Sequence, residues 1–231
     1  MDIDSMNKAN NKIEFVTIEY HQTKKINNGN IIERKECICL DKKEQKLFIK
    51  QDYANCVTSK EYYIPNEIDS LLCQFEKASL CEEKSKEEKF PKYTMNIRYK
   101  DGKKVVLQAG FNRAELPVFW EEFAYELLEI IKNHGVFGDL LDFDIYGKGA
   151  RKNEHIFCSV IFDNIIQPYY YLTEDNSLEI GDSVLVLFGK EKRIARISNI
   201  EYFDSENLPI DLDSIKKIIA KVDRKLSFPT T

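Results

Sequence analysis

The sequence predicts an α+β protein, with antiparallel sheets and packed helices followed by a C-terminal small β-barrel-like module closed by a helix. Three observations predict this class. Segments of alternating apolar and polar residues are separated by turn residues, as in antiparallel sheets. Two later segments carry apolar residues at the three- and four-residue spacing of a helix. A regular hairpin near the C-terminal end is followed by a third stripe of this helical kind, and such segregated strands and helices indicate α+β rather than α/β architecture.

The composition is that of a folded chain. The 231 residues are 43% hydrophobic and 12% aromatic, which is enough to form a core. The 9 Gly and 6 Pro are too few for a low-complexity chain, and no internal repeat is evident. A chain of this length forms one large domain or two small ones.

The first part of the chain opens with a predicted meander. Alternation predicts strands over 12–20, 31–40 and 46–51, the first with a slip in its phase. The turn between the first two, 26–30, contains Asn and Gly, which tolerate positive φ.

Helices and a hairpin follow. Pro65 begins the first predicted helix, and Pro117 begins the second, which Gly135 would cap. Asp101-Gly102 is a two-residue turn signal between the strands of 92–111. The buried helix stripes are expected to be Ile68, Leu71, Leu72 and Phe75, and then Trp120, Phe123, Leu127 and Ile131.

The residue composition changes over 137–153, where Gly147 and Gly149 suggest a connector. We therefore expect an α+β domain over 1–150 and the barrel-like module over 151–231. The module contains four or five strands with turns at Gly181-Asp182 and Gly189-Lys190. Its last helix would lie over 206–225, capped by Asp211 or Asp213. The apolar stripe expected on that helix is Leu212, Ile215, Ile219 and Val222.

The net charge, the first residues and the length of the apolar runs bear on the cellular compartment. With 34 basic and 39 acidic residues the net charge is −5, so the whole chain is not an obvious polyanion binder. The polar start of the sequence lacks the pattern of a secretory signal, and its apolar runs are too short to cross a bilayer. We therefore expect a soluble cytoplasmic protein with no membrane partner.

The sequence motifs do not indicate an enzyme, a metal or a cofactor. The 6 Cys include no CxxC pair and the 3 His are scattered, so reduced thiols are expected, with Cys37 and Cys39 on the same face of a strand. No GxSxG is present, and His155 and Cys158 would point to opposite faces of a strand. The segment 146–153 lacks the features of a P-loop. The clustered carboxylates Asp139, Asp142 and Asp144 leave a metal-dependent hydrolase as a third, weaker alternative, and the "EEK" runs at 82–84 and 87–89 fall in a charged loop rather than after a strand.

A basic rim is expected around the last hairpin. It comprises Lys190, Lys192, Arg193 and Arg196, with Lys216, Lys217, Lys221, Arg224 and Lys225 on the final helix. With Tyr169, Tyr170 and Tyr171 it could form a basic groove with stacking aromatics. Acidic residues in the same region dilute this rim, which favours a solvated surface.

Two resemblances bear on this sequence. "LEIGDSVLVLFGKEKRIARISNIEYF", 178–203, resembles small SH3-like barrels in which a Gly-Asp turn precedes a V-x-V-x-F-G strand, and the N-terminal DNA-binding module of the primosomal helicase has the same rhythm. The whole chain is similar to uncharacterised bacterial proteins through "DGKK", "LPVFWEEF", "IGDSVLV" and "LPIDLDSIKKII". That resemblance implies a setting among bacterial defence and toxin–immunity systems.

Together these observations predict a non-enzymatic protein-binding protein, an immunity or inhibitor protein that blocks a bacterial toxin or effector. Exposed sheet edges could be extended by the partner, and complementary charge could cover a toxin's active site. The expected acidic contacts are Asp139, Asp142, Asp144 and the 82–88 loop. The alternative is a nucleic-acid-associated protein that uses the basic rim, whose binding would weaken steeply with salt. The oligomeric state stays open.

Overall fold

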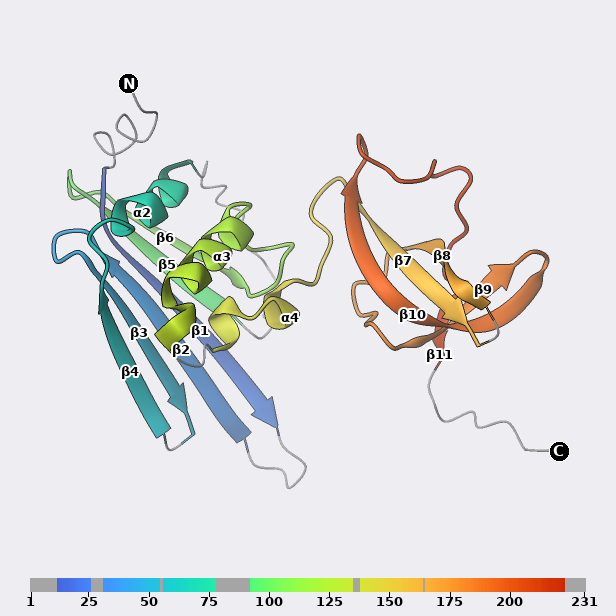
Figure 1. Ribbon diagram of the computed structural model, residues 1–231, viewed down its shortest axis with the longest axis horizontal. Helices are drawn as coiled ribbons and strands as arrows, with labels where there is room; N and C mark the ends of the chain where they lie inside the picture. The colour runs from blue at the N-terminus through green and yellow to red at the C-terminus, as the bar shows by residue number, and fades with distance from the viewer. Residues whose placement is uncertain are drawn as a thin grey trace. The chain divides into compact units, whose positions relative to one another are not determined.

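The chain folds into two compact units, Met1–Gly147 and Lys148–Thr231, in the computed structural model shown in Figure 1. This division lies close to the boundary expected near residue 150. The structure describes residues 12–25, 31–54, 56–77, 92–134, 138–163 and 165–222. The predicted turn at 26–30, the cap at Gly135 and the charged loop of 82–89 lie outside those ranges.

The first unit is built on a six-stranded antiparallel sheet in the order β4-β3-β2-β1-β5-β6. The predicted meander and the Asp101-Gly102 hairpin are both present, with Gly102 at φ 83. Strand β4, which follows the meander, is an addition that sequence reasoning missed. The strands are β1 (Ile13–Lys25), β2 (Ile31–Asp41), β3 (Lys46–Tyr53), β4 (Cys56–Tyr63), β5 (Lys92–Tyr99) and β6 (Lys104–Gly110).

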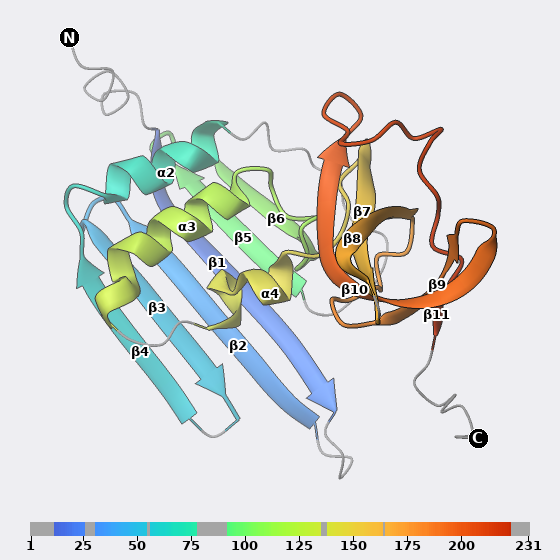
Figure 2. The same ribbon diagram turned by 45° about the vertical axis from the view of Figure 1, so that its right-hand side comes forward.

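Helices cover one face of this sheet, as Figure 2 shows. Both predicted helices form, and their expected apolar stripes are buried. Phe111 meets Trp120 edge to face at a centroid separation of 5.7 Å, within an aromatic cluster under α3. The helical elements are α2 (Ile68–Lys77), α3 (Trp120–Ile131) and α4 (Phe143–Tyr146), with short 3-10 turns η1 (Lys132–His134) and η2 (Asp139–Leu141).

The opposite side of the sheet, here called the open face, carries the alternate residues of each strand. Ile38 and Leu40 of β2 are buried beneath the helices, so the residues that alternate with them, Cys37 and Cys39, point the other way. A side-chain hydrogen bond of 3.1 Å from Asn96 to Thr17 crosses this face. By strand register the open face includes Phe15, Thr17, Glu19, Cys37, Cys39, Phe48, Lys50, Val57, Ser59, Glu61, Tyr63, Thr94, Asn96, Arg98, Val106 and Gln108.

The second unit holds a five-stranded antiparallel sheet in the order β11-β9-β10-β7-β8. Its core includes Cys158, Val160, Val184, Val186 and Ile197. Turn glycines fall where the sequence predicts, at Gly181 and Gly189, both with positive φ. The strands are β7 (Glu154–Phe162), β8 (Ile165–Thr173), β9 (Ser183–Phe188), β10 (Glu191–Asp204) and β11 (Ala220–Val222).

The prediction of a closing helix over 206–225 is wrong for the part that the structure describes. The chain there is extended: the amide of Leu172 donates to Lys216 O, Ile218 donates back to Leu172 O, and β11 pairs with β9. Hydrogen bonds to β8 and to β9 therefore satisfy backbone groups of this segment. Isoleucine is β-branched, so the isoleucines of this segment suit an extended strand as well as a helix stripe. One bridge, Leu172 to Lys217, joins the segment to β8, and within the described residues no continuous ladder closes this sheet into a barrel.

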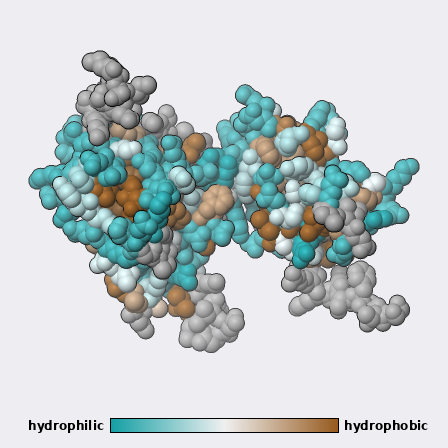
Figure 3. All heavy atoms as spheres, viewed as in Figure 1, coloured by the Kyte–Doolittle hydropathy of each residue, from teal (hydrophilic) through white to brown (hydrophobic). Residues whose placement is uncertain are grey.

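Figure 3 shows a visible surface that is largely hydrophilic, with hydrophobic residues gathered in patches. Within the described residues, no helix has both the length and the apolar character that crossing a bilayer would need.

Proline substitution tests the extended C-terminal segment. Ile218→Pro removes the amide that donates to Leu172 O at 2.9 Å and leaves a buried carbonyl unpaired, so we expect the free energy of unfolding to fall by about 1–3 kcal/mol in urea denaturation. Leu212→Pro is the control, because Leu212 occupies the second position of the turn closed by Ser214 N to Asp211 O, where proline is favoured. Equal costs for the two variants would contradict the extended arrangement.

Candidate functional site

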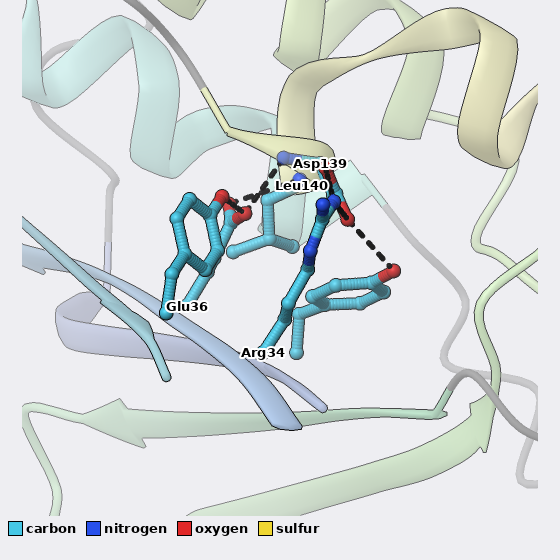
Figure 4. Close-up of polar contacts among 6 residues, drawn as sticks. Arg34, Glu36, Asp139 and Leu140 are labelled. Carbon is cyan, nitrogen blue, oxygen red and sulfur yellow. Dashed lines mark hydrogen bonds and ion pairs between the residues drawn. The ribbon is translucent and has the colours of Figure 1, made fainter. Parts of the chain in front are cut away.

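A buried carboxylate holds the segment after α3 against the sheet. Glu36 projects from the helix-covered side of β2 and is 4% exposed. Its two oxygens accept the backbone amides of Asp139 at 2.7 Å and Leu140 at 3.1 Å, and the Tyr53 hydroxyl also donates to it. Figure 4 shows these contacts converging from two sides. Each carboxylate oxygen is thus occupied by a donor from the chain itself.

A second ion pair flanks this anchor. Arg34 Nη1 lies 3.1 Å from a carboxylate oxygen of Asp139, and the Tyr20 hydroxyl lies 3.5 Å from the same oxygen. The Asp139 side chain is only 13% exposed. Asp139, predicted as a partner contact, is therefore directed at its own sheet.

Burial controls the protonation of this cluster. Removal from water raises the pKa of Glu36, and the hydrogen bonds from Tyr53, Leu140 and Asp139 act against that rise. Burial, together with the neighbouring carboxylates, also raises the pKa of the Tyr20 and Tyr53 hydroxyls. Both phenols consequently remain hydrogen-bond donors, and the arrangement serves to position the backbone.

The other predicted carboxylates do not join Asp139. Asp142 caps α4 and accepts the backbone amide of Asp144 at 2.9 Å, and both side chains are exposed. Within the described ranges, no group of three His, Cys, Asp or Glu has an arrangement that could hold a metal ion. Asp142 and Asp144 are available to a partner as isolated surface charges.

A cleft lies beside the Glu36 anchor, between three strands and η2. Lys60 crosses it and donates to the carbonyl of His134 at 2.8 Å. Burial raises the pKa of Tyr62, whose ring meets that of His134 at 5.6 Å. The cleft is lined by Glu36, Ile38, Ile49, Gln51, Thr58, Lys60, Tyr62, Gly138, Leu140 and Leu141.

Three residues of the predicted basic rim, Arg193, Lys217 and Lys221, are paired with acids. Arg193 lies 2.8 Å from Glu191 and over the ring of Phe188. Lys190, Lys192 and Arg196 are exposed. Other lysines of the unit pair as Lys217 with Glu174 at 2.8 Å, Lys221 with Asp182 at 2.6 Å and Lys148 with Glu179 at 2.5 Å. Such pairing reduces the positive charge that a phosphate backbone would meet.

The predicted aromatic platform is divided between the two sides of β8. Tyr171 is buried and donates to Leu187 O, and Tyr169 packs against the core, while Tyr170 is exposed. Cys158 is fully buried and His155 contacts Ser205 at 3.2 Å, so this thiol and this imidazole lie apart, as the alternation of the strand predicts.

Edge strand β4 is the surface that sequence reasoning missed. It pairs with β3 over its whole length, and no other strand of the described residues pairs with its far side. Val57 is 57% exposed and Tyr63 is 70% exposed, both on the open face. The signal was present in "CVTSKEYY", whose β-branched and aromatic residues favour a strand.

Gly138 leaves room for the anchor, because a Cβ there would overlap both oxygens of Glu36 and the amide of Gln51. We expect Gly138→Ala to lower the free energy of unfolding by about 1–3 kcal/mol. In an E36A background the overlap with the carboxylate is absent, so the same change should cost less. Chemical denaturation of the two single variants and the double variant measures this coupling. Additive costs would contradict the close approach.

The raised pKa of Glu36 has a defined effect on stability. The folded state holds the proton of Glu36 more tightly than the unfolded chain does, so this group's contribution is most favourable below the unfolded pKa and is lost as pH rises through the folded one. Glu36→Gln lacks this titration. The stability of the wild type minus that of E36Q should therefore fall as pH increases from about 4 to about 7 in urea denaturation. A difference that stays constant over this range would refute the assignment.

Comparisons with known proteins complete the description of the site. No protein-family model matches the chain, and no match was found to a curated protein or to a solved structure. Function is therefore argued from the geometry of the chain itself.

Proposed function

We propose that this chain is a non-enzymatic protein-binding protein that recruits an extended segment of its partner to the free edge of β4. The observation that carries the proposal is an eight-residue edge strand, Cys56–Tyr63, with two large apolar side chains exposed along it. Backbone donors and acceptors on such an edge provide affinity for an added strand, and alternate side chains provide specificity.

Two of the features that normally protect a sheet edge, a bulge and a proline, do not occur in β4. Its ladder with β3 runs without a register shift, and the strand contains no proline. The edges of the second unit are less suited, since β8 contains Pro168 and is contacted by Lys216 and Ile218, and β11 has only three residues. Among the described edge strands of the two sheets, β4 combines a regular ladder with two large exposed apolar side chains.

The geometry of β4 specifies what the partner segment must provide. Val57 and Tyr63 lie on the same face near opposite ends of the strand, with Glu61 between them. A partner strand would place apolar residues beside Val57 and Tyr63, and residues facing the helix side would lie near Tyr62. Burial of the two exposed side chains would supply the central anchoring contacts of the interface.

Within this class we propose an immunity or inhibitor protein that blocks a bacterial toxin or effector. The support for the finer assignment is the resemblance to bacterial proteins of toxin–immunity settings, together with the net charge of −5. Asp142 and Asp144, exposed beside α4, are the acidic residues available to contact a basic partner.

The test uses the product of the adjacent gene as the defined partner, co-expressed and purified with this chain. Val57→Lys combined with Tyr63→Lys should weaken binding about 10- to 100-fold, since each change removes an apolar anchor from the interface. Val106→Lys is the matched control, because Val106 is 61% exposed on the same face but lies on β6, at the opposite edge. Titration calorimetry measures the affinities.

Hydrogen exchange supplies an independent readout. Partner binding should slow the exchange of β4 amides and leave those of β6 unchanged. Failure of the wild type to bind, equal affinities for the double variant and V106K, or protection confined to β6 would each reject recruitment at β4.

A further inference from the structure

Two thiols lie side by side on the open face. Cys37 and Cys39 of β2 are partly buried and their sulfur atoms are 3.5 Å apart. Neighbouring strands place Glu19 and Lys50 on either side of Cys37, and Thr17 and Phe48 on either side of Cys39. The two sulfur atoms therefore lie next to each other, among neighbouring side chains that are polar or aromatic.

The backbone spacing of the pair suits a shared metal ion better than a disulfide. Residues two apart on a strand have Cα atoms about 6.6 Å apart, at the upper limit for a disulfide, whose sulfurs must approach to about 2.05 Å. Two thiolates that bind one metal ion in a line, each at about 2.3 Å, lie about 4.6 Å apart. The sulfurs lie 3.5 Å apart as hydrogen-bonded thiols, and rotation about χ1 can increase that separation without backbone movement.

Metal binding requires that the pair lose its protons, because the thiolate and not the thiol is the ligand.

We propose that Cys37 and Cys39 form a binding site for one soft, thiophilic metal ion, Cu⁺. Thiolate ligands select soft ions. No third His, Cys, Asp or Glu within the described part of the chain completes a metal-binding group with them. Zn²⁺ in a protein takes four ligands, whereas Cu⁺ is satisfied by two thiolates. Binding forms two Cu–S bonds and releases the thiol protons to solvent, with no change in oxidation state.

The experiment is an anaerobic titration of the full, reduced chain with Cu⁺ held by a chromogenic chelator. The wild-type chain should take one equivalent of Cu⁺ from the chelator, and this binding should require Cys37 and Cys39. Cys37→Ser and Cys39→Ser should each weaken that binding at least tenfold. Cys56→Ser is the matched control, since Cys56 is an exposed thiol on the edge strand of the same sheet, and it should bind like wild type. Far-UV circular dichroism verifies that every variant is folded.

Several results would overturn the site. The site is rejected if the wild-type chain takes no Cu⁺ from the chelator. It is also rejected if C37S, C39S and the wild type bind copper equally. Mass spectrometry after mild peroxide treatment distinguishes metal binding from disulfide formation. If the chain binds no Cu⁺ and peroxide then removes both thiols of this pair, the pair forms a disulfide and is not a metal site. The site does not depend on the proposed partner.

Discussion

One buried carboxylate organises the first unit. Glu36 lies on the covered face of β2, beside the buried Ile38, where an unpaired charge would be costly. It is stable there because the backbone amides of Asp139 and Leu140 and the hydroxyl of Tyr53 satisfy its oxygens. The anchor fixes the chain after α3 across the end of the sheet, and Gly138 is needed because no Cβ fits beside the carboxylate. Breaking one partner would leave a buried charge uncompensated.

The Glu36 anchor holds the 138–141 segment on one side of the sheet, so the two sides of the sheet differ in chemistry. The covered side carries the core, including Ile38 and Leu40. The open face carries the thiol pair of Cys37 and Cys39 in the middle and the exposed side chains of β4 at one edge. A rigid sheet suits both proposed roles, since it holds side chains at fixed register and presents a regular row of backbone groups at its edge.

Most of the first unit was predictable from local pattern. Alternation located β1, β2 and β3, Asp101-Gly102 located the hairpin, and helical spacing located α2 and α3. These signals are read within a few residues, and tertiary packing agrees with them. The last segment shows where such a reading fails: Ile215 and Ile219 fit a helix stripe, yet Ile218 and its neighbours pair with two sheet edges that are remote in sequence. A helix pattern contains no information about those edges.

Sequence alone indicated antiparallel sheets with packed helices and placed Cys37 and Cys39 on one face of a strand, because each follows from spacing along the chain. Only the tertiary structure decided that Asp139 is directed at Arg34 while Asp142 and Asp144 remain on the surface, that Lys217 is paired with Glu174, and that β4 lies at an edge of its sheet. The physical reason is that burial, ion pairing and edge position depend on which distant segments meet, and no local periodicity encodes that meeting.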